Sequence, residues 1–214
     1  MMRNWFFPLA LSLACGAHAA PPQRVEIVYQ LSHNGTVVAE VTDRLEHDGQ
    51  RYALQETWKG KGVFALRGEA QRSSRGTVAR DGLRPAEYHD VRAGRERRHA
   101  NFDPQNALAT LQQQDRLSFV WSFAFAPPAT PVTVKVSDGS GVVTYAYRPA
   151  GRERIATAAG EFDTLKLVRQ KDGPGGRSDE IWLAADRQYL PVRVQVTDRD
   201  GTRIDKSALR ITAP

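Results

Sequence analysis

The sequence predicts an all-β protein: an antiparallel meander that curls into an open or closed β-barrel of about ten to thirteen strands, with one short helix. Short runs of alternating apolar and polar residues recur along the chain, as in Gln188–Asp198, where Leu190, Val192, Val194 and Val196 share one side. Glycine turns separate these runs, and Asp200-Gly201 is the clearest hairpin signal. One stretch, Asp115–Phe125, shows helical spacing instead.

The N-terminus has the three parts of a secretory signal. Arg3 precedes the apolar run Trp5–Ala14, and the small residues Ala17 and Ala19 follow it. The apolar run is too short to cross a bilayer as a helix, so no transmembrane segment is expected. We therefore expect residues 1–19 to be a signal peptide, and residues 20–214 to form a single β-barrel-like domain located in the periplasm of a Gram-negative type cell.

A second interpretation concerns Cys15, the one cysteine of the chain. Leu13-Ala14-Cys15-Gly16 partly resembles a lipoprotein box, in which Cys15 would carry the lipid of a membrane-anchored lipoprotein. Ser12 stands where such a box usually has leucine, which favours soluble export. Cleavage after Ala19 would leave a chain without thiols, and therefore without disulfides or cysteine metal sites.

The formal net charge of +6 points to anionic partners. For an exported protein these are envelope lipids and polymers, and no nucleic acid is expected. Solubility alone is an equally good reason for a charge of this size.

The strands of the first half follow one another at short intervals. Turns are expected at Asn34-Gly35, Asp48-Gly49 and Ala93-Gly94. The predicted strands are Arg24–Ser32, Thr36–Glu46, Gln50–Lys59, Phe64–Ser74, Arg84–Val91 and Glu96–Phe102.

The short helix is expected within Asp115–Phe125. Asp115 can cap its N-terminus, Leu117, Val120 and Trp121 recur at helical spacing, and two prolines follow at 127 and 128. We expect it to plug the barrel interior or to cover the barrel mouth, and the stretch Phe102–Asp115 before it to be a long loop.

The second half resumes the β pattern. A turn at Ala150-Gly151 is expected to divide two of the runs, and the glycine cluster in Asp172–Gly176 to interrupt the final meander. The predicted strands are Val132–Ser137, Val142–Arg148, Glu153–Thr157 and three runs within Glu161–Ile204.

Several short motifs occur in an order typical of one group of exported bacterial proteins. They are Gly82-Leu83-Arg84-Pro85 followed by Tyr88, Phe102-Asp103, Gln114-Asp115 with Leu117-Ser118, Gly160 with Phe162-Asp163-Thr164, Ile181-Trp182-Leu183 and Leu190-Pro191. On these motifs the chain resembles the domain-of-unknown-function 3108 family over nearly all of its mature length. The resemblance implies a periplasmic or envelope-associated β protein with no assigned reaction, and it brings no catalytic residues.

Aromatic residues are the first candidate site. We expect an apolar pocket inside the barrel, because barrels of moderate strand number can hold one ligand. Its candidate lining residues are Trp58, Phe64, Trp121, Phe125 and Trp182. For any single one of these residues, an ordinary aromatic core is the better explanation.

The basic run Arg92–His99 is the second candidate. Guanidinium groups match phosphate and carboxylate geometry, so Arg95, Arg97, Arg98 and His99 are a candidate anion-binding set. On a regular strand Arg95, Arg97 and His99 share one face. The alternative is an outward, solvated face that protects a strand edge.

Catalytic and metal-binding constellations are not expected. Of His33, His47, His89 and His99, none has the spacing of a zinc motif, although His89-Asp90 and His99 with Asp103 could converge in space. No GxSxG elbow surrounds any serine. We therefore expect no catalytic residues, no metal and no cofactor.

The sequence thus predicts an exported, non-enzymatic protein that binds a lipid, a lipopolysaccharide-like molecule or another apolar or amphiphilic molecule of the envelope. The alternatives are a structural module that docks on an envelope protein and, more remotely, a hydrolase of envelope polymers.

Overall fold

The computed structural model describes residues 20–102, 113–170 and 176–213. Four predictions fall outside these ranges: the signal peptide with Cys15, the interior of the Phe102–Asp115 loop, the pairing of His99 with Asp103, and most of the Asp172–Gly176 turn.

The described residues form thirteen strands, one α-helix and two short 3₁₀ helices. In chain order the elements are β1 (Arg24–His33), β2 (Thr36–His47), β3 (Arg51–Gly60), η1 (Gly62–Arg67), β4 (Ala70–Ala79), β5 (Gly82–Arg92), β6 (Arg95–Asn101), β7 (Gln113–Asp115), α1 (Ser118–Phe125), β8 (Val132–Ser137), β9 (Val142–Thr157), β10 (Gly160–Arg169), β11 (Ser178–Ala184), η2 (Ala185–Arg187), β12 (Leu190–Thr197) and β13 (Arg203–Thr212). Among the described residues, no helix has both the length and the apolar character needed to cross a membrane.

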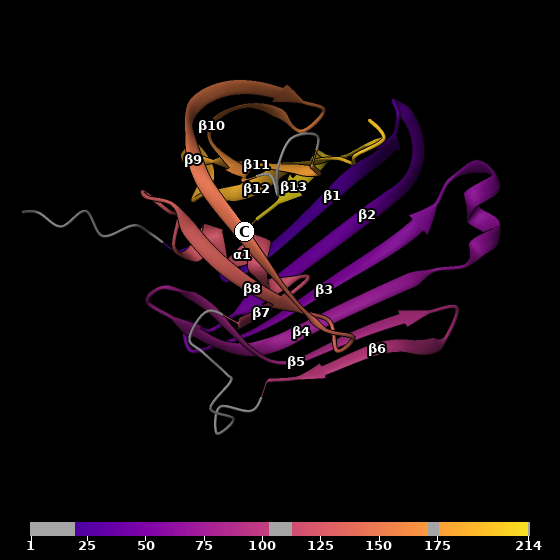
Figure 1. Ribbon diagram of the computed structural model, residues 1–214, viewed down its shortest axis with the longest axis horizontal. Coiled ribbons are helices and arrows are strands. Elements are labelled where there is room, and N and C mark those ends of the chain that lie inside the picture. Colours follow the sequence, from indigo (N-terminus) through magenta and orange to yellow (C-terminus); the bar gives the residue numbers. More distant parts are fainter. Residues whose placement is uncertain (1–19, 103–112, 171–175, 214) are drawn as a thin grey trace, which may run out of the picture.

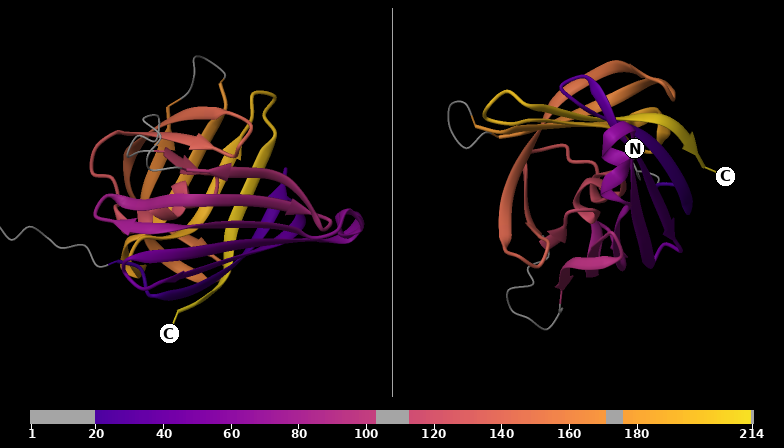
Figure 2. Two further views of the ribbon diagram at one scale, coloured as in Figure 1. Left: turned by 90° about the horizontal axis from the view of Figure 1, so that it is seen from below. Right: turned by 90° about the vertical axis from the view of Figure 1, so that its right-hand side faces the viewer.

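All thirteen strands belong to one sheet, in the order β6-β5-β4-β3-β2-β1-β13-β12-β11-β10-β9-β8-β7. Neighbouring strands are antiparallel, except that β7 runs parallel to β8. The first strand pairs with the last, so the chain forms two meanders that meet at β1 and β13 (Figures 1 and 2). The predicted all-β class and antiparallel meander are confirmed.

The sheet curls into a barrel whose seam is closed by side chains. At the seam, the Gln114 side-chain amide donates to the Leu83 carbonyl at 2.6 Å, and the Leu83 N–H donates to Ser122 Oγ at 2.9 Å. Arg98 on β6 also pairs with Asp138 beyond β8 at 3.0 Å. The barrel is therefore nearly closed, with α1 packed along the seam (Figure 1).

Helix α1 begins where the sequence predicts. Asp115 Oδ1 accepts hydrogen bonds from the backbone N–H groups of Leu117 and Ser118, both at 2.7 Å. These donors have no partner inside the helix, so the carboxylate stabilises the helix start. Asp115 therefore stabilises the helix start as predicted, although the N-cap residue itself is Leu117, two positions later.

Helix α1 also joins the two apolar cores. Trp121 packs with Ile27, Val41 and Leu54 of the first meander. Phe123, two residues on, packs with Leu167 and Leu183 of the second. The helix is thus a plug within the barrel, one of the two positions expected.

The prediction of a strand over Phe64–Ser74 is wrong in its first part. The 3₁₀ helix η1 occupies residues 62–67, and β4 starts at Ala70. Gly62, the first residue of η1, and Gly68, which follows it, have φ of +57° and +75°, values that favour glycine. A Cβ on Gly60 would overlap the Phe64 carbonyl, so the tight return of η1 onto β3 requires this glycine too.

The predicted turn at Ala150-Gly151 is also wrong, because β9 runs unbroken from Val142 to Thr157. Pro149 lies opposite Leu167, and the register of β9 against β10 shifts between Leu165 and Leu167. Gly151 has φ of +103°. A bulge with a flexible glycine bends a strand without reversing it, so this signal marks a bend of β9.

Candidate ligand-binding cavity

The barrel encloses two adjoining hollows. The inner chamber, of about 370 Å³, lies beneath α1 and is lined by Tyr29, Trp58 and Trp121 among others. The outer chamber, of about 510 Å³, lies beside η1 and is lined mainly by apolar groups, including Val38, Trp58 and Phe64. Leu31, Trp58 and Arg72 line both chambers. The two chambers therefore adjoin at these three residues.

The strand pattern explains the lining. Alternate residues of β1, β2 and β3 point inward, and these include Tyr29, Leu31, Ala39, Val41 and Trp58. Because a strand has a period of two, the same alternation sends the charged residues between them to the solvent. The aromatic lining is thus a direct consequence of a pattern visible in the sequence.

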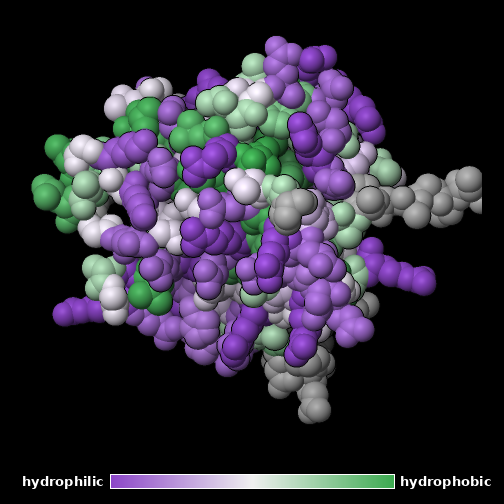
Figure 3. Space-filling view, turned by 180° about the vertical axis from the view of Figure 1, so that it is seen from behind, coloured by the Kyte–Doolittle hydropathy of each residue, from purple (hydrophilic) through white to green (hydrophobic). Residues whose placement is uncertain are grey.

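Helix η1 borders the opening of the outer chamber. Phe64 lines the chamber, whereas Val63 and Leu66 are 76% and 91% exposed. Figure 3 shows apolar side chains at the end of the molecule formed by η1, and a more hydrophilic surface over much of the rest of this face. The opening is therefore edged by apolar groups that face solvent.

A buried charged group forms one wall of the inner chamber. Lys206 Nζ donates to both Asp43 oxygens, at 3.0 and 2.9 Å, and to Glu56 Oε2 at 2.8 Å. Arg72 donates to Glu56 Oε1 at 2.8 Å, and Trp121 Nε1 to Asp43 at 3.3 Å. We call Asp43, Glu56, Arg72 and Lys206 the inner cluster; it pairs two carboxylates with two cations.

Burial and pairing shift the two acids in opposite directions. Burial raises the pKa of Asp43 to about 6, although Lys206 opposes the shift. Burial acts on Glu56 in the same way, but the charges of Lys206 and Arg72 outweigh it and lower the pKa of Glu56 to about 2. Both acids are therefore ionised at neutral pH, and the cluster has no net charge.

Asp115 is a third buried acid, outside the two chambers. Besides the helix start it binds Ser74, whose Oγ lies 2.5 Å from Asp115 Oδ2. Burial raises the pKa of Asp115 to about 6, against the hydrogen bonds that favour its ionised form. Its partners are all parts of the fold, so we assign it a structural role.

The predicted aromatic set is brought together only in part. Trp58, Phe64 and Trp121 line the two chambers. Phe125 lies elsewhere, edge-on to His47 with ring centroids 5.0 Å apart. Trp182 is buried between Lys166 and Arg193, which lie over its ring, and its indole N–H donates to Glu153.

The predicted anion-binding set is also divided. Arg97, Arg98 and His99 line a shallow, open hollow together with Arg92, and Arg95 is not among its lining residues. Arg98 is engaged by Asp138 and Ser140. A register shift in the β5–β6 pair places Arg95 opposite Arg92 and His99 opposite His89. Arg95 and His99 therefore lie on opposite faces, contrary to the expectation for a regular strand.

The sequence analysis did not identify the inner cluster. Its members come from β2, β3, β4 and β13, and Asp43 and Lys206 are 163 residues apart. One signal was available: Asp43, Glu56 and Arg72 each interrupt the apolar side of a predicted strand, where an unpaired charge would be unstable.

The family model described as "Protein of unknown function (DUF3108)" matches residues 28–128 and 113–206. No functionally curated protein matches the chain. A similar solved structure is described as a "putative lipoprotein" of Parabacteroides distasonis, with 11% identity, coverage of 90% of this chain and 97% of that one, and a TM-score of 0.45.

Two further solved structures are similar. A β-barrel-like protein of the domain of unknown function DUF1849 from Brucella abortus has 9% identity, coverage of 92% of this chain and 100% of that one, and a TM-score of 0.47. A "putative exported protein" with a YmcC-like fold from Bacteroides fragilis has 10% identity, coverage of 90% and 98%, and a TM-score of 0.41.

Proposed function

The chain belongs to the DUF3108 family, whose function is unknown. From the geometry of the chain itself, we propose that it is an exported, non-enzymatic protein that binds an amphiphilic molecule of the cell envelope inside its barrel. The observation that carries this proposal is the pair of adjoining chambers. Their volumes, about 510 and 370 Å³, fall within the ~300–1,000 Å³ typical of ligand sites.

The outer chamber combines apolar and cationic groups, and this combination suits an amphiphile. Leu31, Val38 and Phe64 offer apolar surface in the outer chamber, where an acyl chain would be removed from water. Arg72 and Arg92 line the same chamber, and Arg92 is about half exposed. An anionic head group could therefore lie against Arg92 while the chain packs on Trp58 and Phe64.

The charged groups of the inner chamber support the non-enzymatic part of the proposal. Both acids of the inner cluster are bound by Lys206, and Glu56 also by Arg72, so their oxygens are engaged in ion pairs within the fold. The cluster supports the proposal in another way, as a fixed polar wall that limits how deep an apolar chain can enter.

Location in the periplasm, by way of a signal peptide at residues 1–19 or a lipid on Cys15, is part of the proposal. The apolar edge of the opening supports it, since Val63 and Leu66 would meet a membrane or a carrier from which an amphiphile is taken up.

Native mass spectrometry of protein purified from a periplasmic extract, before and after organic extraction, tests the proposal. We expect a bound mass that extraction removes. The extracted protein should then bind a fluorescent fatty acid, and Ala70→Trp, which fills part of the outer chamber, should weaken binding at least tenfold. Ala53→Trp, on an exposed position of β3, is the matched control.

Equal binding by both variants, or none by the extracted protein, would refute the proposal.

A second candidate is a module that docks on another envelope protein. The exposed Val63 and Leu66 favour it, because apolar groups at the tip of a projecting segment are typical contact points. Crosslinking in cells tests it: a specific partner lost in the Val63→Ser, Leu66→Ser double variant would support this role in place of ligand uptake.

A further inference from the structure

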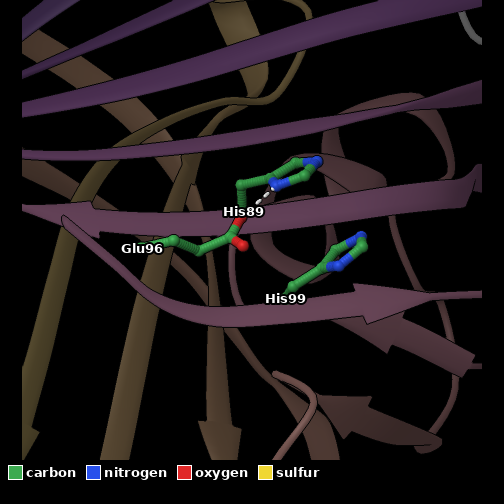
Figure 4. Close-up of side chains that lie close together, drawn as sticks. All are labelled: His89, Glu96 and His99. Carbon is green, nitrogen blue, oxygen red and sulfur yellow. Dashed lines mark hydrogen bonds and ion pairs between the residues drawn. The ribbon is translucent and has the colours of Figure 1, made fainter. Parts of the chain in front are cut away.

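Three donor side chains meet on the outer face of the β5–β6 hairpin. His89, Glu96 and His99 each place a ligand atom within 4.8 Å of the others. Figure 4 shows both imidazoles on the same side of the hairpin, with Glu96 beside them. We call these residues the outer cluster. It lies outside the barrel and has no part in the proposed ligand chambers.

An irregularity in the strands creates the outer cluster. The turn at Ala93-Gly94 pairs Arg92 with Arg95 and Val91 with Glu96, and continued regular pairing would bring Arg98 opposite His89. A register shift between Asp90 and Val91 brings His99 there in its place. Paired residues of an antiparallel sheet share a face, so both histidines and Glu96 point outward together.

The contacts within the outer cluster have the chemistry of a metal site. His89 Nδ1 lies 2.6 Å from Glu96 Oε1, and the two imidazole rings stack with centroids 4.4 Å apart and an angle of 11°. Imidazole nitrogen and carboxylate oxygen are ligands for zinc and similar divalent ions, at about 2.0–2.2 Å. The stacked rings must turn to share one ion, which their exposure permits.

A fourth residue completes the arrangement that metal-binding histidines usually have. His89 Nε2 lies 3.6 Å from Glu87 Oε2, on the side of the ring away from Glu96. Glu87 is itself held by Arg75, at 2.6 Å. A histidine that binds a metal through one nitrogen typically donates its other N–H to such a carboxylate, which orients the ring.

We propose that His89, Glu96 and His99 bind one divalent transition-metal ion of the zinc type, with Glu87 orienting His89 and a coordination position left open to solvent. The ion would replace the direct contact between His89 Nδ1 and Glu96 Oε1. Two imidazoles select zinc, copper or nickel over magnesium and calcium, which prefer oxygen ligands.

The surrounding charges are balanced enough to permit a cation. Arg97 and Arg98 line the hollow next to His99 and oppose a second positive charge. Arg98, however, is paired with Asp138, and Arg75 with Glu87. Glu96 as a ligand and Glu87 beside His89 add two carboxylates that favour a cation.

Isothermal titration of untagged protein with zinc chloride tests the proposal. We expect one equivalent to bind, and His89→Ala and His99→Ala each to weaken binding at least a hundredfold. Glu87→Gln should weaken it about 10–100-fold, as expected for a residue that orients a ligand. His33→Ala is the matched control, since His33 is exposed at the end of β1 and belongs to no part of the outer cluster.

A second measurement separates binding from loss of the fold. Zinc should raise the melting temperature of the native protein but not that of His99→Ala, because an ion that binds the folded state stabilises it by mass action. The proposal is overturned if zinc does not bind, or if it binds His89→Ala and His99→Ala as well as the native protein. Either result would mean that the outer cluster is only an exposed ion pair between His89 and Glu96, with the ring of His99 stacked on His89.

Discussion

The inner and outer clusters are built from similar parts in opposite surroundings. Each joins carboxylate and nitrogen groups from different strands, and each depends on side chains that share one face of the sheet. In the inner cluster, Asp43 and Glu56 are 3% and 5% exposed and each acid contacts a cation. In the outer cluster, Glu96 and His99 are exposed, and one close pair holds the group together.

The difference teaches that burial decides what a charged group can do. A buried charge that loses its partner cannot be rescued by water, so the inner cluster is constrained to remain complete. Exposed groups exchange partners at little cost, since water competes with each contact. The inner cluster therefore shapes the chamber, while the outer cluster is free to accept an ion.

The largest effect is expected when the inner cluster loses its shared cation. Lys206→Met leaves Asp43 without a cation and Glu56 with Arg72 alone. Breaking a buried pair in this way costs about 3–5 kcal/mol, which urea unfolding would measure as a lower midpoint at unchanged slope.

The exposed Lys135→Met on β8 is the control and should be nearly neutral. A double variant that adds Asp43→Asn should recover part of the loss, because the carboxylate left without a cation is then gone while Glu56 keeps Arg72. If Lys206→Met is as stable as Lys135→Met, the fold does not require the inner cluster to be complete.

A smaller effect is expected from pH. The pKa values of Asp43 and Asp115 are raised by burial to about 6, above their unfolded values of about 4. Their contribution to stability is fully present below pH ~4 and is lost as the pH rises through 6, by on the order of 3 kcal/mol for each acid. Glu56, with its pKa lowered to about 2, has the opposite sign and loses its contribution below pH ~4.5.

Asp115→Asn separates these contributions, because an amide oxygen can still accept from Leu117 and Ser118. Urea unfolding at several pH values should show a shallower loss of stability between pH 4 and 6 in this variant. Asp186→Asn, at an exposed position of η2, should keep the native slope. An unchanged slope in Asp115→Asn would show that this acid does not hold its proton in the folded state.

Much of the fold could be predicted, because its signals are local. Alternation in β1 to β3 predicted the buried faces, and the glycine turns predicted most of the hairpins. In β12 the expected alternation is not seen, because Leu190, Pro191 and Val192 are all buried and the rest of the strand is half-buried on both sides. The errors occurred where a local signal has two structural outcomes. Gly151 marks a bend instead of a turn, and the glycines around residues 60–68 frame η1 instead of joining two strands.

The candidate sites were less predictable, because they depend on pairing between distant strands. Trp58 and Trp121 share the inner chamber although they are far apart in the chain. The outer cluster needed one further fact, the register shift beside Asp90, without which Arg98 would lie opposite His89. Sequence spacing alone does not reveal such a shift. The sequence therefore allowed His89 and His99 to lie near each other, but it did not place them opposite each other on paired strands.

The smallest effect is expected in the outer cluster without metal. Glu96→Gln removes the charge that pairs with His89, yet an exposed pair contributes within about 1 kcal/mol, so urea unfolding in the presence of a chelator should barely change. In the presence of zinc the same variant should lose most of the added stability, since a ligand to the ion is gone. Glu161→Gln, which removes a similarly exposed partner of Arg154, should behave alike with and without zinc. A difference that appears in Glu96→Gln only when zinc is present would separate an ion-binding group from a surface ion pair. Equal behaviour of the two variants would show that Glu96 does not bind the ion.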